Sequence, residues 1–205
     1  MITVRQATSS KELEATYRFR YSIYAEEMNG KQKYADHQQK TLVDPLDGQE
    51  GCCVLTAWEG DEIVGTVRTN FLRSSEIGEY HELYSLRDLP PSLLHQTAIT
   101  TRLMIHPTHR RRTLSTRLAC EIFRFGLEHG ITTDFIDCCH HLVEYFAGLG
   151  YHIHRNELEH PEHGLVTVMR LNLRDFENLE QLGSPFLKIV RDWNAHGQLR
   201  GDDTV

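Results

Sequence analysis

Three consecutive arginines stand where an apolar segment passes into a helical one. The stretch "LMIHPTHRRRTLSTRL" covers residues 103–118, with Arg110, Arg111 and Arg112 just before the helical periodicity begins. A helix N-terminus has unpaired N–H groups and the positive end of the helix dipole, so it binds phosphate readily. A planar guanidinium adds bidentate contacts to the same anion. The pattern therefore indicates a phosphate site, with a solvated basic turn as the alternative.

A second set of charged residues lies in or near apolar segments. Arg68 and Arg102 fall within runs that alternate like strands, where an unpaired buried charge is costly. Asp44 and Asp47 lie in residues 29–50, which have no periodicity and are expected to form a long, functional loop. The arginines either pair with these aspartates in a structural network or hold a carboxylate of the substrate.

Titratable side chains also follow the strand expected at "TDFIDC", residues 133–138. His140 or His141 could serve as a general base, although the chain has thirteen histidines and either could stand here by chance. Tyr145 could serve as a general acid or have only a packing role. "DCCHH" places its candidate ligands side by side, and contiguous residues do not converge easily on one tetrahedral ion. No metal is therefore expected.

The elements that must position these residues are predicted from periodicity and turn signals. The capping box of Ser9 and Glu12 begins a helix over about 10–27, and Gly130 ends another that starts at 114. Strands are expected at 2–7, 52–58, 63–72, 98–105, 133–138, 151–154 and 165–173, and further helices at 142–150 and 185–195, with 155–163 as a polar loop. We expect an α/β fold with a mixed sheet of about seven strands, helices on both faces and a C-terminal helix.

Length and composition set broad limits on the function. The chain has 205 residues and a formal net charge of −7, which argues against a general nucleic-acid binder. No apolar run approaches the ~20 residues of a membrane span. The five cysteines form two adjacent pairs and a singleton, a pattern that favours a reducing, cytoplasmic location over a disulfide framework.

The strand, His-Pro turn, arginine and helix together resemble the acyl-thioester-binding motif of the GNAT acyltransferases. The family pattern after the proline is Gln/Arg-x-x-Gly-x-Gly/Ala, and here residues 110–115 read "RRRTLS". "LTAWEGDEIVGTVRTN" is similar to the second and third strands of that fold, and "YFAGLGY" to its "Y-x-x-L-G-F" segment. The resemblance runs from about residue 2 to 173. It implies one acyltransferase domain over 1–177 and a C-terminal helical extension over 178–205.

The same resemblance implies a set of donor contacts. The acyl-CoA, or another phosphopantetheine-linked acyl donor, would be held by the backbone or side chains of Leu103, Met104, Ile105, Arg110, Arg111, Arg112, Thr113, Leu114, Ser115 and Thr116. Two departures from the pattern stand out. Thr113 and Ser115 replace both glycines, and Phe146 stands where the family often has a catalytic tyrosine, with Tyr145 adjacent.

The first half is similar to autoinducer synthases and long-chain N-acyl amino acid synthases. Those relatives share an arginine-rich first helix, a D-x-x-D loop and arginines on two strands. The matching residues here, which the resemblance implies are substrate-binding, are Arg20, Asp44, Asp47, Arg68 and Arg102. Ile99 replaces the glutamate of autoinducer synthases, so homoserine-lactone chemistry is not supported.

This resemblance implies an N-acyltransferase that moves an acyl group directly from acyl-CoA or an acyl carrier protein to a small-molecule or peptide amine. An acetyl-CoA-dependent acetyltransferase and a non-catalytic binding module are the alternatives. Acyl-chain length, donor, acceptor and oligomeric state stay open.

Overall fold

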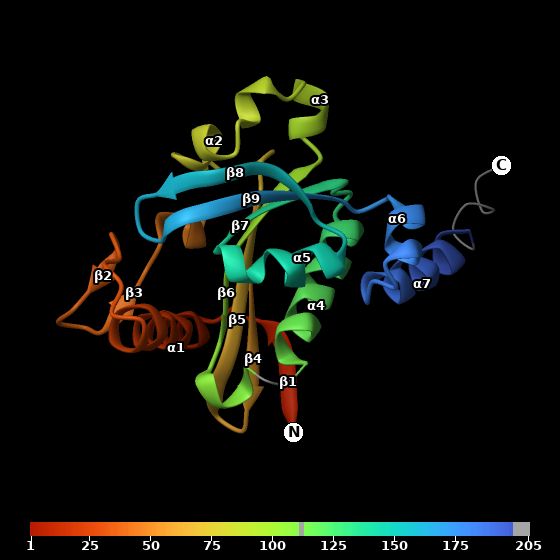
Figure 1. Cartoon of the computed structure of the whole chain (residues 1–205). Helices are drawn as coiled ribbons and strands as arrows, with labels where there is room; N and C mark the ends of the chain where they lie inside the picture. Colours follow the sequence, from red (N-terminus) through yellow and green to blue (C-terminus); the bar gives the residue numbers. More distant parts are fainter. Residues whose placement is uncertain (111–112, 199–205) are drawn as a thin grey trace.

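The computed structural model describes residues 1–110 and 113–198. In this part of the chain, one mixed sheet has the strand order β1-β4-β5-β6-β7-β9-β8 (Figure 1). The strands are β1 (Ile2–Gln6), β4 (Cys52–Glu59), β5 (Glu62–Phe71), β6 (Thr97–Ile105), β7 (Thr133–Cys138), β8 (His152–His160) and β9 (Gly164–Asn172). Neighbouring strands are antiparallel except for β6 and β7, which are parallel. The predicted mixed sheet is confirmed.

Helices cover both faces of the long central strands. Figure 1 shows α1 (Ser10–Tyr21) on one side of β4, β5 and β6 and α4 (Leu114–Glu128) on the other. Because both faces are covered, every residue of β5 from Val64 to Phe71 is buried. The remaining helices are α2 (Tyr80–Leu83), α3 (Pro91–Leu94), α5 (Val143–Leu149), α6 (Phe176–Gln181) and α7 (Phe186–Gln198). Within the described residues, no helix is both long and apolar enough to cross a bilayer.

The first helix begins as predicted but changes form near its end. The Glu12 backbone N–H donates to the Ser9 hydroxyl, and the Ser9 backbone N–H donates to the Glu12 carboxylate, which confirms the capping box. The last six residues, Ser22–Glu27, form a π-helix, and the Met28 N–H reaches back to the Ile23 carbonyl at 3.0 Å. Such wide turns re-aim side chains and occur often at functional sites.

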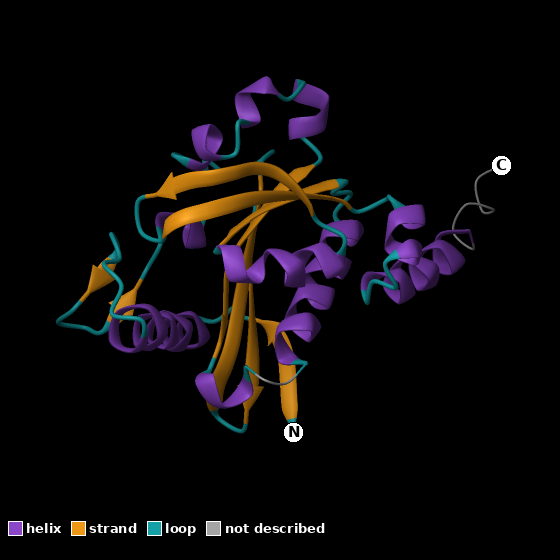
Figure 2. Cartoon of the chain, viewed as in Figure 1, coloured by secondary structure: helices purple, strands orange, loops and turns teal. Residues whose placement is uncertain are grey.

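β6 and β7 pair over a short distance and then separate. Their partners are Thr97 with Thr133, Ala98 with Asp134 and Ile99 with Phe135. Beyond Ile99 the β6 edge has no partner from β7, so its alternate backbone N–H and C=O groups are open on that side (Figure 2). A bulge follows at Arg102, whose φ of 58° lies in the left-handed region.

Two expectations about loops are wrong. Residues 155–163 were expected as a loop, but β8 extends to His160, because backbone pairing with β9 is enough to hold an edge strand with polar side chains. The register shifts along β8, and Glu157 adopts a φ of 54°. The segment 29–50 also contains a small hairpin of β2 (Ala35–Asp36) and β3 (Thr41–Leu42), followed by a 3₁₀ turn at Pro45–Gly48.

Candidate active site

A cavity of about 540 Å³ lies where β6 and β7 separate. The part of the cavity next to α4, α5, β7 and β9, called the apolar recess here, is lined by apolar side chains. This wall includes Ala119, Ile122, Phe123, Gly126, Ile136, Leu149, Leu171 and Leu173. Toward α1 the lining becomes polar and aromatic, with Tyr24, Tyr80, Arg102, Asp137 and His163. One continuous space therefore joins an apolar recess to a polar mouth.

Arg110 lies at the end of the cavity next to the N-terminus of α4. Its guanidinium donates to both carboxylate oxygens of Glu27, at 2.5 and 2.7 Å, and its Nε donates to the Ile105 carbonyl at 3.0 Å. The two terminal nitrogens of the Arg110 guanidinium are thus already oriented to bind an anion in a bidentate manner, and the Glu27 carboxylate is the anion they bind here. Arg111 and Arg112 lie outside the described residues.

The other residues predicted to contact the acyl donor differ in whether they line the cavity. Leu103, Met104, Ile105 and Ser115 line the cavity, whereas the Leu114 side chain packs in the core beside Leu118. Thr113 precedes α4 and makes no side-chain capping hydrogen bond to it, and Thr116 is half-buried. Among the described residues, the first N–H groups of α4 therefore have no cap from the Thr113 side chain and can serve an anion.

The charged residues of the first half form a buried ion network. Arg20 donates to both oxygens of Asp47 at 2.6 and 2.7 Å, and Arg68 lies 3.0 Å from Asp44 and 3.4 Å from Asp47. Arg102 is 2.7 Å from Asp44. Burial raises the pKa of Asp44, but Arg68 and Arg102 outweigh it and hold that pKa well below its usual range.

Of these five residues, Arg102 alone lines the cavity within the part of the chain that the structure describes. Arg20 and Arg68 are fully buried. Ion pairing, one of the two alternatives for Arg68, therefore accounts for the positions of Arg68, Asp44 and Asp47. It also accounts for the position of Arg20, for which the resemblance implies substrate binding. Arg102 also contacts Glu162 at 3.4 Å and lies over the Tyr24 ring, which leaves it between the network and the cavity.

The predicted acid and base candidates lie in different surroundings. His140 and His141 are both exposed in the turn before α5, and His141 lines the cavity. Tyr145 also lines it, and its hydroxyl is buried with no hydrogen-bond partner among the described residues. A buried hydroxyl without a partner costs about 1–3 kcal/mol, so its position suits a group that meets a ligand.

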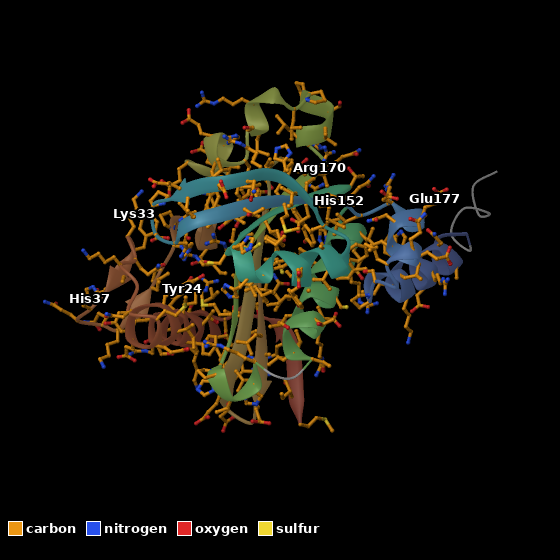
Figure 3. All side chains as sticks on the ribbon, viewed as in Figure 1. Tyr24, Lys33, His37, His152, Arg170 and Glu177 are labelled. Atoms are coloured by element: carbon orange, nitrogen blue, oxygen red, sulfur yellow. The ribbon has the colours of Figure 1, made fainter. Side chains whose placement is uncertain are left out.

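His163 is a further candidate that the sequence did not single out. It follows β8 in the turn to β9, with the rings of Tyr24 at 5.3 Å and His160 at 4.5 Å. Figure 3 shows Tyr24 in the space between α1 and the β8–β9 hairpin. Burial, then His160, lower the pKa of His163, so its imidazole is neutral near pH 7 and can accept a proton.

The sequence does not reveal His163, because residues 155–163 have the composition of a polar loop. No local motif marks it, and it reaches the cavity because β8 and β9 form a hairpin whose turn lies against Tyr24 of the π-helix after α1. The polar mouth is completed by Asp137, whose carboxylate accepts a hydrogen bond from the Tyr84 hydroxyl.

A family model described as N-acyl amino acid synthase FeeM matches residues 15–172. The chain belongs to this family. This FeeM-family chain is therefore an N-acyltransferase, and the alternative of a non-catalytic module is set aside. No significant match was found among curated protein sequences.

Solved structures share the fold of the FeeM-family chain. The structure of FeeM, an N-acyl amino acid synthase from uncultured soil microbes, has a TM-score of 0.69 at 9% identity and covers 92% of this chain and 97% of that one. MesI, a CoA-dependent acyl-homoserine lactone synthase, has a TM-score of 0.68 at 20% identity, covering 88% and 93%. BjaI, another such synthase solved with SAM and isopentyl-CoA, has 0.68 at 19%, covering 90% of each chain. These likenesses confirm the predicted GNAT fold.

Proposed function

We propose that the enzyme transfers a long acyl chain from a phosphopantetheine thioester to the amine of a small acceptor. The observation that supports this most strongly is the cavity of about 540 Å³, which joins an apolar recess to a polar mouth that holds a neutral imidazole. An acetyl group would leave most of this apolar lining without contact. The cysteine pattern supports a cytoplasmic enzyme, where acyl-CoA and acyl carrier protein occur.

The donor is held at the α4 end of the cavity. Arg110 and the uncapped N–H groups of α4 bind phosphate, which replaces the Glu27 carboxylate on the guanidinium. Acyl-CoA and acyl carrier protein present the same pantetheine arm, and both are donors under this proposal. The arm follows the open edge of β6, where Leu103–Ile105 have no β7 partner.

The thioester carbonyl lies near the bulge of β6. Backbone N–H groups freed by the bulge and by the separation from β7 stabilise the oxyanion that forms when the amine attacks. The acceptor enters between Tyr24, Asp137 and His163, and His163 removes the amine proton. Tyr145 donates its unpartnered hydroxyl proton to the leaving thiolate.

Transfer is direct, without an acyl-enzyme intermediate on Cys138. Burial raises the pKa of this thiol to about 12, so it stays protonated at neutral pH and is a poor nucleophile. The amine nitrogen therefore bonds directly to the thioester carbon, and the carbon–sulfur bond breaks as the tetrahedral intermediate collapses. Holding the two reactants together in one cavity supplies much of the rate.

The test is a donor panel with purified enzyme. Acetyl-CoA, octanoyl-CoA, tetradecanoyl-CoA and a tetradecanoyl carrier protein are each incubated with a mixture of amino acids and amines, and products are identified by mass spectrometry. We expect N-acyl products whose kcat/KM rises with chain length. Turnover with acetyl-CoA alone would refute the long-chain proposal.

The phosphate role of Arg110 is tested separately by donor affinity. Arg110→Ala should weaken CoA binding by about tenfold to a hundredfold, the value of one charge-assisted bidentate contact. Arg124→Ala is the matched control, because Arg124 lies on α4 and pairs only loosely with Glu121, at 3.5 Å. Equal affinities of the two variants would contradict the role.

A further inference from the structure

The apolar recess of the cavity contains a polar cluster near the start of the strand separation. Asp134, Thr100 and Tyr151 all line the cavity among aliphatic side chains. The Asp134 carboxylate accepts the Tyr151 hydroxyl at 2.6 Å and the Thr100 hydroxyl at 2.9 Å. Asp134 is paired in register with Ala98, one residue before β6 and β7 part. This cluster has no part in the transfer step.

The hydrogen bonds of the cluster all run toward the carboxylate. Thr100 has one hydroxyl hydrogen, which it can donate to Asp134. In that case, Thr69 is the donor in the 3.3 Å hydrogen bond between the Thr69 and Thr100 hydroxyls. Tyr151 also uses its hydrogen on Asp134. When Asp134 is ionised, its carboxylate also accepts the Phe135 backbone N–H. The side-chain groups that remain for a ligand are then acceptor lone pairs of the carboxylate and the tyrosine oxygen. A ligand that meets this cluster must bring a hydrogen-bond donor.

An alkyl chain alone leaves these lone pairs without a partner, and a hydroxyl on the chain satisfies one of them. We propose that the enzyme selects acyl donors that carry a hydroxyl group in the middle or outer part of the chain, held by Asp134. The inference rests on the proposed function, because the acyl chain must occupy the recess.

The position of the hydroxyl follows from the strand. The thioester lies near Leu103, three residues from Thr100, which is about 10 Å along a strand. An extended chain advances about 1.2 Å per bond, so this span corresponds to about eight carbons. The hydroxyl that reaches Asp134 is therefore well beyond the carbons next to the thioester.

The ionisation of Asp134 provides an independent readout. Burial raises its pKa to about 7, whereas Tyr151 and Tyr84, the other buried titratable groups near it, have pKa values raised well above 10. A hydroxyl that donates to the carboxylate favours the charged form and lowers the Asp134 pKa. Binding of a hydroxylated donor near pH 7 then releases protons, whereas binding of the plain chain does not.

The experiment compares plain decanoyl-CoA with decanoyl-CoA hydroxylated at about the sixth to the tenth carbon. Wild-type enzyme should prefer the best-placed hydroxyl in kcat/KM by about tenfold to a hundredfold, the strength of a hydrogen bond to a charged group. Asp134→Asn, of the same shape, should reduce the ratio to about one, and Thr100→Val should lower it by less. Ile136→Val, on the same strand and lining the same cavity, is the control and should keep the wild-type ratio.

Calorimetry in two buffers of different ionisation enthalpy measures the released protons, and the melting temperature of each variant shows that it is folded. Equal rates for plain and hydroxylated chains in the wild type would overturn the inference and leave the proposed function intact. A preference that persists in folded Asp134→Asn would also overturn it. Absence of transfer from every donor would instead refute the proposed function.

Discussion

Replacing Asp47 by asparagine removes one negative charge from the buried ion network with little change in shape. Asp47 binds Arg20 with both oxygens and lies 3.4 Å from Arg68, and both arginines are fully buried. Two atoms of the Arg20 guanidinium already have no partner in the described part of the chain. After the substitution, Arg20 retains no carboxylate. Removal of one partner from a buried ion pair costs about 3–5 kcal/mol.

For a chain of this size, each kcal/mol lowers the melting temperature by about 2–4 °C, so Asp47→Asn should melt about 6–20 °C below the wild type. Urea unfolding should give a lower midpoint with an unchanged m-value. Arg18→Ala is the control, because the Arg18–Glu14 pair is exposed on α1 and contributes less than about 0.5 kcal/mol. Below its melting temperature, the variant should keep the wild-type KM for the acceptor. Unchanged stability with a raised KM would refute the structural role of the network.

Four further results are expected. The kcat/KM of the wild type should fall as the pH drops through the lowered pKa of His163. His163→Gln should be about 10²–10⁴ slower and should no longer show this fall at acidic pH. A fall that persists in the variant would belong to another titrating group. Tyr145→Phe should lower kcat without lowering the melting temperature, since it removes an unpartnered hydroxyl, whereas a parallel loss of stability would indicate packing. Ala119→Phe should reduce the kcat/KM for tetradecanoyl-CoA relative to acetyl-CoA by roughly tenfold, and an unchanged ratio would place the chain elsewhere. The pKa of Asp44 is lower in the folded than in the unfolded protein. Urea unfolding should therefore show the wild type to be more stable than Asp44→Asn above about pH 4, with the difference lost on further acidification. A stability difference that does not depend on pH would contradict the lowered pKa.

The features that the sequence predicts well are local. The capping box at Ser9 and the left-handed Gly130 after α4 depend on residues within one or two turns, and they occur where expected. The hairpin of β4 and β5 likewise follows from alternation and its turn. These features are determined by neighbouring residues, so they can be predicted without knowledge of the tertiary contacts.

The features that the sequence misses depend on contacts between distant segments. β8 carries polar side chains, and only its pairing with β9 shows that it is a strand. His163 becomes a site candidate because the ring of Tyr24, 139 positions earlier in the sequence, lies against it. The sequence does not reveal the ion pair of Arg20, because its partner Asp47 lies 27 residues away. No local pattern encodes these distances.

In the described part of the chain, the two halves of the sheet are joined by a β6–β7 ladder of three residue pairs, with the apolar recess beside it. Under the proposed function, a bound acyl chain fills this recess and becomes a removable part of the hydrophobic interior. The melting temperature of the donor-bound enzyme should therefore rise with each methylene of the acyl chain, and the enzyme should be least stable after the product has left.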